Sequence, residues 1–202
     1  MNGRFSYRWS VIAFAMVLGG AFAWPTGVEA QTASGQARAV QATVFGLLGA
    51  TTTVLGDTGA LGGSSDALQA SALTGSVPSL LTGDVLHATT LGLGNEVDSE
   101  AALGDLALSV AGTTIGADSV MARAFAALGS AGLAISNVDN LAINGVPIPI
   151  SGAPNQTVYI PGGQVVINEQ QTSPVSTVVN ALHVTVYGVA DVVIASATAG
   201  IQ

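Results

Sequence analysis

The residues of this 202-residue chain that could do chemistry are acidic side chains, two histidines and one amide-rich segment. Glu96, Asp98 and Glu100 alternate along the sequence, so in an extended segment they project from one face. Carboxylates are the hard oxygen ligands that Ca²⁺ prefers, and we name these three as candidate Ca²⁺ ligands, with no other cofactor indicated. The competing interpretation is a charged strand edge that resists pairing. The sequence contains neither an EF-hand loop nor a glycine-aspartate nonapeptide repeat.

A second candidate is the polar segment Asn168, Glu169 and Gln170, in which two amides flank one carboxylate. Such a segment could bind a sugar, form a buried polar network or close the end of a strand. Glycoside hydrolysis needs a second carboxylate that faces Glu169 across the scissile bond. The sequence does not give the distance between two such carboxylates. We therefore favour the structural interpretation.

His87 and His183 are the two histidines of the chain, and both lie in strand-like segments. A Ser-His-Asp group would need one of them to be oriented by a carboxylate and to face a hydroxyl. The sequence has no Gly-x-Ser-x-Gly motif and no paired zinc-ligand spacing. We therefore predict that the protein is not an enzyme and assign neither histidine a functional role.

The first thirty residues have the features of an export signal. Two arginines precede an apolar run at residues 11–24, which is shorter than the ~20 residues that a membrane-spanning helix needs. The segment then ends at Ala30 with small residues of the kind that signal peptidase favours. We expect a helical signal peptide at residues 1–30, cleavage between Ala30 and Gln31, and a single domain at residues 31–202.

Charge and composition exclude several classes of partner. Residues 1–30 contain two of the four basic residues and one of the twelve acidic ones, so residues 31–202 keep two arginines against eleven carboxylates and a formal charge of −9. A chain this acidic, without lysine, is a poor partner for nucleic acids and anionic lipids. Without cysteine it has neither disulfides nor a thioether lipid anchor. Beyond the signal no apolar stretch reaches membrane-spanning length, and we expect a secreted or cell-surface protein with non-covalent attachment.

Alternating polar and apolar segments, separated by Gly, Pro, Asn and Asp, predict strands and turns in the rest of the chain. Asn144-Gly145 suits a type I′ hairpin turn, because both central residues of that turn need positive φ. Pro147 and Pro149 require an edge position. Two further hairpins are predicted to pair residues 157–160 with 164–168, and residues 178–187 with 192–199.

A short pattern, Asp-x-(Leu/Val)-x-Ala-x-(Ala/Thr), begins at Asp66, Asp84, Asp118 and Asp191. Residues 120–128, in the third copy, are good helix formers, but the β-branched fourth copy leads us to assign all four as strands. Their unequal spacing disfavours a regular coil, and alternating alanines would let two sheets approach closely. We predict an all-β, antiparallel β-sandwich, with an irregular β-solenoid as the alternative.

Several C-terminal segments together resemble the choice-of-anchor P family, bacterial exported proteins whose members carry different C-terminal surface anchors. The segments are Asn144-Gly145-Val146-Pro147-Ile148, Gly152-Ala153-Pro154-Asn155-Gln156-Thr157, Ile160-Pro161-Gly162, Val166-Ile167-Asn168-Glu169-Gln170, Val179-Asn180-Ala181-Leu182-His183-Val184 and Asp191-Val192-Val193-Ile194-Ala195-Ser196-Ala197. The resemblance implies a bacterial secreted or cell-surface protein, and it brings no catalytic residues. Because no sortase or comparable anchor signal follows these segments, we expect no covalent attachment.

These observations favour a non-enzymatic structural or assembly protein of the bacterial envelope or matrix. A sparsely charged sheet has few features that block its edges, so edges could pair with a second copy; residues 36–45 are the candidate donor strand. The alternative is an adhesive or ligand-binding module that recognises a cell-surface glycan or Ca²⁺ through a loop from Glu96 to Asp105 or through the Asn168–Gln170 segment.

Overall fold

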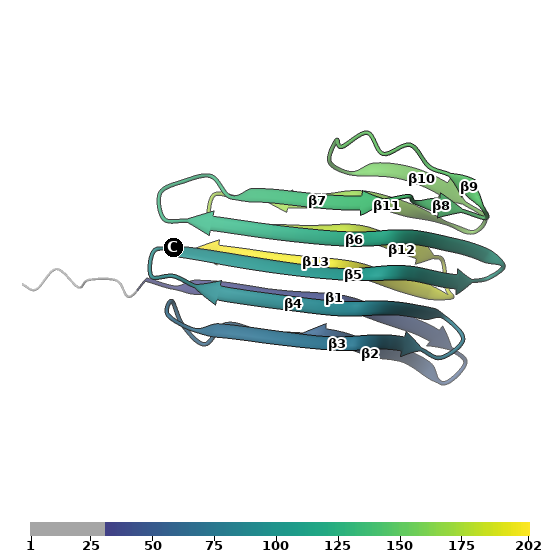
Figure 1. Ribbon diagram of the computed structural model, residues 1–202, viewed down its shortest axis with the longest axis horizontal. Coiled ribbons are helices and arrows are strands. Elements are labelled where there is room, and N and C mark those ends of the chain that lie inside the picture. Colours follow the sequence, from purple (N-terminus) through teal and green to yellow (C-terminus); the bar gives the residue numbers. More distant parts are fainter. Residues whose placement is uncertain (1–30) are drawn as a thin grey trace, which may run out of the picture. The chain divides into compact units, whose positions relative to one another are not determined.

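Two antiparallel β-sheets pack face to face in the computed structural model, which describes residues 31–202 (Figure 1). Sheet A contains six strands in the order β10-β11-β12-β13-β1-β2. Sheet B contains seven, in the order β3-β4-β5-β6-β8-β9, with β7 pairing to β6 beside β8. The prediction of an antiparallel β-sandwich is confirmed, and the solenoid alternative is wrong. The predicted signal peptide lies outside the described residues.

The strands of sheet A are β1 (Ala33–Gly46), β2 (Gly49–Asp57), β10 (Gln156–Ile160), β11 (Gly163–Thr172), β12 (Ser176–Val186) and β13 (Ala190–Ile201). Those of sheet B are β3 (Ala67–Val77), β4 (Leu81–Gly92), β5 (Glu96–Val110), β6 (Thr113–Ala127), β7 (Leu133–Asp139), β8 (Ala142–Ile143) and β9 (Val146–Pro147).

The predicted hairpins are all present. Asn144 and Gly145 join β8 to β9 with φ of 51° and 74°, as a type I′ turn requires. Pro147 lies on β9, at the edge of sheet B, where its missing N–H costs no ladder bond. The β10–β11 and β12–β13 pairs form the other two hairpins.

Residues 120–127 form part of strand β6 despite their helix propensity. Val120, Ala122 and Ala124 are completely buried against the other sheet, and the residues between them face outward. Burial of this two-residue alternation outweighs a propensity difference of less than about 1 kcal/mol per residue. The Asp-containing copies lie in β3, β4, β6 and β13, so their assignment as strands is confirmed.

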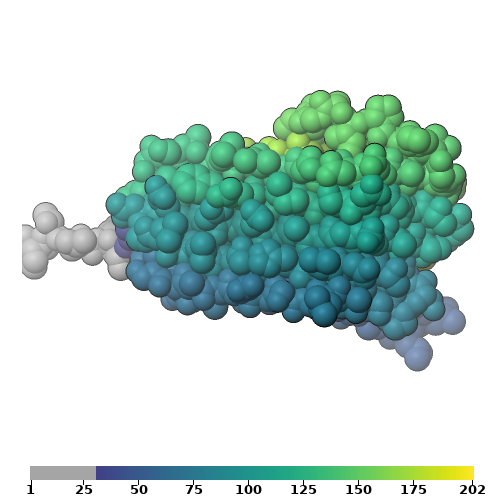
Figure 2. All heavy atoms as spheres, viewed as in Figure 1, coloured from purple at the N-terminus to yellow at the C-terminus, as the bar shows by residue number. Residues whose placement is uncertain are grey.

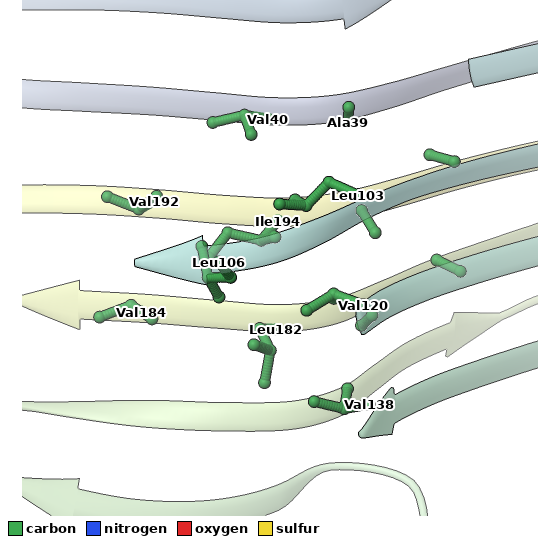
Figure 3. Packing of buried hydrophobic residues seen from close by; sticks show 14 of the residues in the cluster. Ala39, Val40, Leu103, Leu106, Val120, Val138, Leu182, Val184, Val192 and Ile194 are labelled. Carbon is green, nitrogen blue, oxygen red and sulfur yellow. The ribbon is translucent and has the colours of Figure 1, made fainter. Parts of the chain in front are cut away.

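The core fills the space between the sheets and changes character along the strands. Its middle is built of large aliphatic side chains such as Val40, Leu103, Leu182 and Ile194 (Figure 3). Toward the end where β1 begins, alanines replace them: Ala37, Ala88, Ala101, Ala122, Ala124, Ala197 and Ala199 are buried.

The two sheets approach each other closely at this alanine-rich end, as the alternating alanines predicted. A Cβ on Gly35 of β1 would lie 2.7 Å from Thr90 and 2.8 Å from Val97 of the opposite sheet, closer than side chains tolerate. Two buried hydroxyls in the sandwich, Ser99 Oγ and Thr177 Oγ1, have no hydrogen-bond partner. Close packing there thus leaves polar atoms unsatisfied, which destabilises the fold.

A break in the alternation of side chains crosses sheet A. The register passes over one residue on each strand, namely Gly56 on β2, Ala39 on β1, Ala195 on β13, Ala181 on β12 and Asn168 on β11, and continues unchanged beyond it. Three of these residues, on alternate strands, have positive φ: Gly56 (57°), Ala195 (50°) and Asn168 (54°). On β1, β11, β12 and β13 two consecutive residues at this row are buried, so the side chains that follow change face. The break in alternation therefore decides which polar residues share the outer face of sheet A.

The candidate donor segment is not free. Residues 36–45 belong to β1, which lies inside sheet A and pairs with β13 on one side and β2 on the other. Both of its hydrogen-bonding edges are filled by its own chain. The expectation that it donates itself to a neighbour is therefore wrong for this fold, and only the outermost strands present open edges.

Candidate functional site

The densest polar cluster on the outer face of sheet A surrounds His183. Its Nδ1 lies 2.9 Å from Glu169 Oε2, and its Nε2 lies 3.1 Å from Asp191 Oδ2. Asn180 Nδ2 donates to Glu169 Oε2 at 2.6 Å, and Thr185 Oγ1 lies 3.4 Å from Asp191 Oδ2. Three neighbouring strands, β11, β12 and β13, contribute these side chains. We call these five residues the His183 cluster.

The register and the break in side-chain alternation together assemble the cluster. Glu169 is directly opposite Asn180, and Thr185 is directly opposite Asp191. Ala181 and Leu182 both point into the core, so Asn180 and His183, three residues apart, face the same outer side. In an unbroken strand, residues three apart would face opposite sides. The break in alternation at Ala181 and Leu182 thus places His183 on the same face as Glu169.

The electrostatics of the cluster favour a protonated histidine. The hydrogen bond to Glu169 has the largest effect on the pKa of His183 and raises it. Partial burial lowers this pKa, and the hydrogen bond to Asp191 raises it again. The net result is a pKa of about 9. The same bond to His183 lowers the pKa of Glu169, against partial burial, with Asn180 assisting. At neutral pH the cluster is therefore an imidazolium held between two carboxylates.

This geometry suits cross-linking of strands better than catalysis. Each ring nitrogen of His183 contacts a carboxylate, which leaves neither nitrogen to accept a proton from a hydroxyl. A general base also needs a pKa near the working pH, and the two carboxylates move that of His183 upward. The arrangement ties β11, β12 and β13 together by charge-assisted hydrogen bonds.

The predicted polar segment is divided between two sides of its strand. Asn168 is buried; its Nδ2 donates to Gly152 O at 3.2 Å, and its Oδ1 accepts from Gln170 Nε2 at 2.8 Å. Gln170 Nε2 also lies 3.3 Å from Ala134 O on β7, whereas Glu169 joins the His183 cluster. The amides thus form a structural network, and the three residues do not make one binding patch.

The acidic candidates do share a face, as predicted. Glu96, Asp98 and Glu100 alternate with the buried Val97 and Ser99 at the start of β5. Within residues 31–202, no group of three or more acidic or histidine side chains is arranged to hold a metal ion.

Asp98 already has a cationic partner. Arg123 on β6 donates from Nε to Asp98 Oδ1 at 2.9 Å and from Nη2 to Oδ2 at 2.5 Å. The other arginine of the described chain, Arg38, lies 3.3 Å from Asp57 across β1 and β2. Both arginines therefore link neighbouring strands, in the same manner as His183.

The depression at the turns between β6 and β7 and between β11 and β12 carries little chemistry. It has a volume of about 550 Å³ and is lined by Gly129, Ser130, Ala131, Gly132, Thr172, Ser173 and Pro174. None of these side chains is titratable. The depression contains none of the candidate residues.

The contacts of His183 have only a partial signal in the sequence. The predicted pairing of residues 178–187 with 192–199 places Asp191 opposite the end of the first strand, and His183 and Thr185 share a face. The contact with Glu169 depends on the neighbouring strand β11 and on the break in alternation at Ala181, which no local pattern revealed. His87, the other histidine, lies partly buried on β4, far along the chain from the cluster.

No family model, curated protein or solved structure matches this chain. The resemblance to the choice-of-anchor P family therefore stays a prediction. Within residues 31–202, no helix has the length and apolar character needed to cross a membrane.

Proposed function

We propose that this protein is an exported, non-enzymatic structural protein of a bacterial envelope or matrix, whose copies associate through the edge strands β2 and β3. The observation that carries this proposal is that both edges are long and uncharged. Residues 49–56 of β2 and all of β3 contain no charged side chain and no proline. Charges and prolines are the usual means by which edge strands avoid pairing.

The two open edges lie together. β2 ends the order of sheet A, and β3 ends that of sheet B; in Figure 1 they run side by side along the lower margin of the sandwich. Val54 on β2 and Leu73 on β3 are exposed apolar residues of these strands, 40% and 85% accessible. A neighbouring copy can therefore meet apolar side chains as well as unpaired backbone groups.

Prolines block β9 and β10 on the opposite margin, whereas β7 beside them contains none. There β9 contains Pro147, and β10 lies between Pro154 and Pro161. Proline has no N–H to donate to an added strand. The contrast of β2 and β3 with the proline-bearing β9 and β10 edges supports pairing of β2 and β3 with a second copy.

The polar side chains support a non-enzymatic role. His183, Arg38 and Arg123 each bridge neighbouring strands, so the strongest polar contacts reinforce the sheets. The resemblance to exported bacterial proteins is consistent with an extracellular location.

Association is tested with protein purified from the producing cells, by analytical ultracentrifugation and electron microscopy. The variant Val54→Lys/Leu73→Lys places positive charge on both open edges, and we expect it to weaken self-association by about tenfold or more. The control Ile135→Lys/Val146→Lys adds the same charge to exposed positions toward the other margin and should leave association unchanged.

Monomers at every concentration would overturn the proposal, as would equal effects of the two variants. Monomeric protein that binds on a glycan array would favour the adhesive alternative. Cell fractionation checks the location, and retention in the cytoplasm would contradict export.

A further inference from the structure

One end of the sandwich carries no charge. It consists of the strand ends and turns at residues 43–53, 77–82, 108–115, 141–147, 158–165 and 185–190, none of which contains Asp, Glu, Lys, Arg or His. The register aligns these turns within each sheet, and Figure 1 shows them at the right-hand end of both sheets. We call this the uncharged end. The formal charge of −9 on residues 31–202 is carried entirely by the rest of the chain.

The β1–β2 hairpin projects beyond this end. Val44 of β1 still pairs with Ala190, the first residue of β13, whereas β1 and β2 continue pairing to Gly46 and Gly49. The two further strand residues extend the hairpin by about 7 Å beyond the pair of Val44 and Ala190. Figure 2 shows the hairpin standing out at the lower right of the surface.

The tip of this hairpin is strongly apolar. Leu47 and Leu48 are fully exposed, and Phe45 is 46% accessible. Backbone pairing of Phe45 with Ala50 and of Gly46 with Gly49 satisfies polar groups up to the turn itself. Such a tip can enter an apolar phase without leaving a long stretch of unpaired backbone.

Exposed tyrosines lie behind the tip. Tyr187 N donates to Gly162 O at 2.9 Å, and Phe45 N donates to Val189 O at 2.9 Å. These bonds join the β10–β11 turn, the β12–β13 turn and β1. Tyr159 and Tyr187, 81% and 66% accessible, are thereby held on the same end. Tyrosine, with an apolar ring and a polar hydroxyl, is enriched at membrane–water interfaces.

We propose that the Leu47–Leu48 tip inserts into the interfacial layer of a lipid bilayer with zwitterionic headgroups, with Tyr159 and Tyr187 at the headgroup level. The side chains of both leucines are uncovered, which suits a fluid phase that closes around them. The acidic body of the chain is repelled by anionic lipid, whereas its uncharged end can approach a neutral surface. This contact is independent of the β2 and β3 edge pairing.

The test measures co-sedimentation of protein purified from the producing cells with phosphatidylcholine vesicles. We expect binding that Leu47→Ser/Leu48→Ser weakens by about tenfold or more and that added phosphatidylglycerol also weakens. The matched control Leu128→Ser/Leu133→Ser removes two leucines that are about half exposed in the β6–β7 region and should keep the binding. Thermal unfolding of each variant confirms that the fold is intact.

A second readout locates the contact. Because the chain has no cysteine, Leu48→Cys and Leu133→Cys can each carry one environment-sensitive fluorophore. Vesicles should shift the emission of the label at position 48 to the blue and leave that at position 133 unchanged.

Absence of vesicle binding, equal shifts at both labels, or binding that survives loss of both tip leucines would overturn the proposal. Lipid-free oligomers that the tip variant dissociates would show that a second copy covers the tip instead. Loss of association in Val54→Lys/Leu73→Lys with vesicle binding retained would separate the two proposals.

Discussion

His183 and Glu169 lie on adjacent strands of sheet A, with Nδ1 2.9 Å from Oε2, although fourteen positions separate them along the chain. Asp191 lies 3.1 Å from the other ring nitrogen. An imidazolium between two carboxylates links three strands through one side chain. The cluster thus makes the stability of sheet A depend on pH.

The first prediction concerns that dependence. Because the pKa of His183 is raised from 6.5 to about 9 in the fold, its contribution to the free energy of unfolding is complete below pH 6.5 and is lost as pH rises to about 9. Glu169, whose pKa is lowered from 4.5, contributes fully above pH 4.5 and loses its contribution as pH falls. Stability from this pair should therefore be greatest between pH 4.5 and 6.5.

Denaturant unfolding of the wild type and of His183→Asn across pH measures the effect. We expect the variant to be less stable by about 1–2 kcal/mol at pH 6, after allowance for partial exposure, and the difference to shrink toward pH 9. An NMR titration of His183 should have its midpoint near 9, lowered by Glu169→Gln. A midpoint near 6.5 would contradict the assignment.

A second prediction concerns the unpaired hydroxyls at Ser99 and Thr177. A buried hydroxyl without a partner costs about 1–3 kcal/mol, so Ser99→Ala and Thr177→Val should each raise the free energy of unfolding by about 1 kcal/mol. Ser109→Ala, at an exposed position of the same strand as Ser99, serves as control and should change it by less than about 0.5 kcal/mol. Destabilisation by both core variants would show that the hydroxyls have partners.

The third prediction compares two hairpin turns. Ala111 in the β5–β6 turn and Asn144 in the β8–β9 turn have φ of 48° and 51°, a region that asparagine tolerates better than alanine. Ala111→Asn should therefore stabilise the fold by up to about 1 kcal/mol.

The reverse change should be costly. Asn144 Oδ1 also accepts a hydrogen bond from Thr114 N at 2.8 Å, so Asn144→Ala should destabilise by about 1–2 kcal/mol. Thermal and denaturant unfolding measure both variants. Destabilisation of the fold by Ala111→Asn as well as by Asn144→Ala would argue against a conformational cause.

The fourth prediction concerns Ca²⁺. Arg123 occupies both carboxylate oxygens of Asp98, so millimolar Ca²⁺ or a chelator should leave the melting temperature unchanged. Arg123→Gln should cost less than about 1 kcal/mol, as exposed ion pairs do. A rise in melting temperature with Ca²⁺ in the wild type would revive the acidic face as a metal site.

Local patterns in the sequence were enough for the strands and several turns. Period-two burial predicted them because one face of each strand must meet a core. Asn144-Gly145 specified its turn because few residues accept positive φ. Residues 120–127 favour a helix by propensity, but their similarity to the β-branched segment that begins at Asp191 predicted a strand correctly.

Tertiary structure alone decided the strand order, the break in side-chain alternation and the polar contacts. β1 lies inside sheet A, between β13 and β2, because β13, from the other end of the chain, pairs with it, and no local pattern encodes so distant a pairing. The break in alternation at Ala181 changes the face on which His183 emerges and so allows the contact with Glu169. Sequence determined which segments alternate; only long-range packing determined which of their outward side chains meet, because the register depends on neighbours distant in the chain.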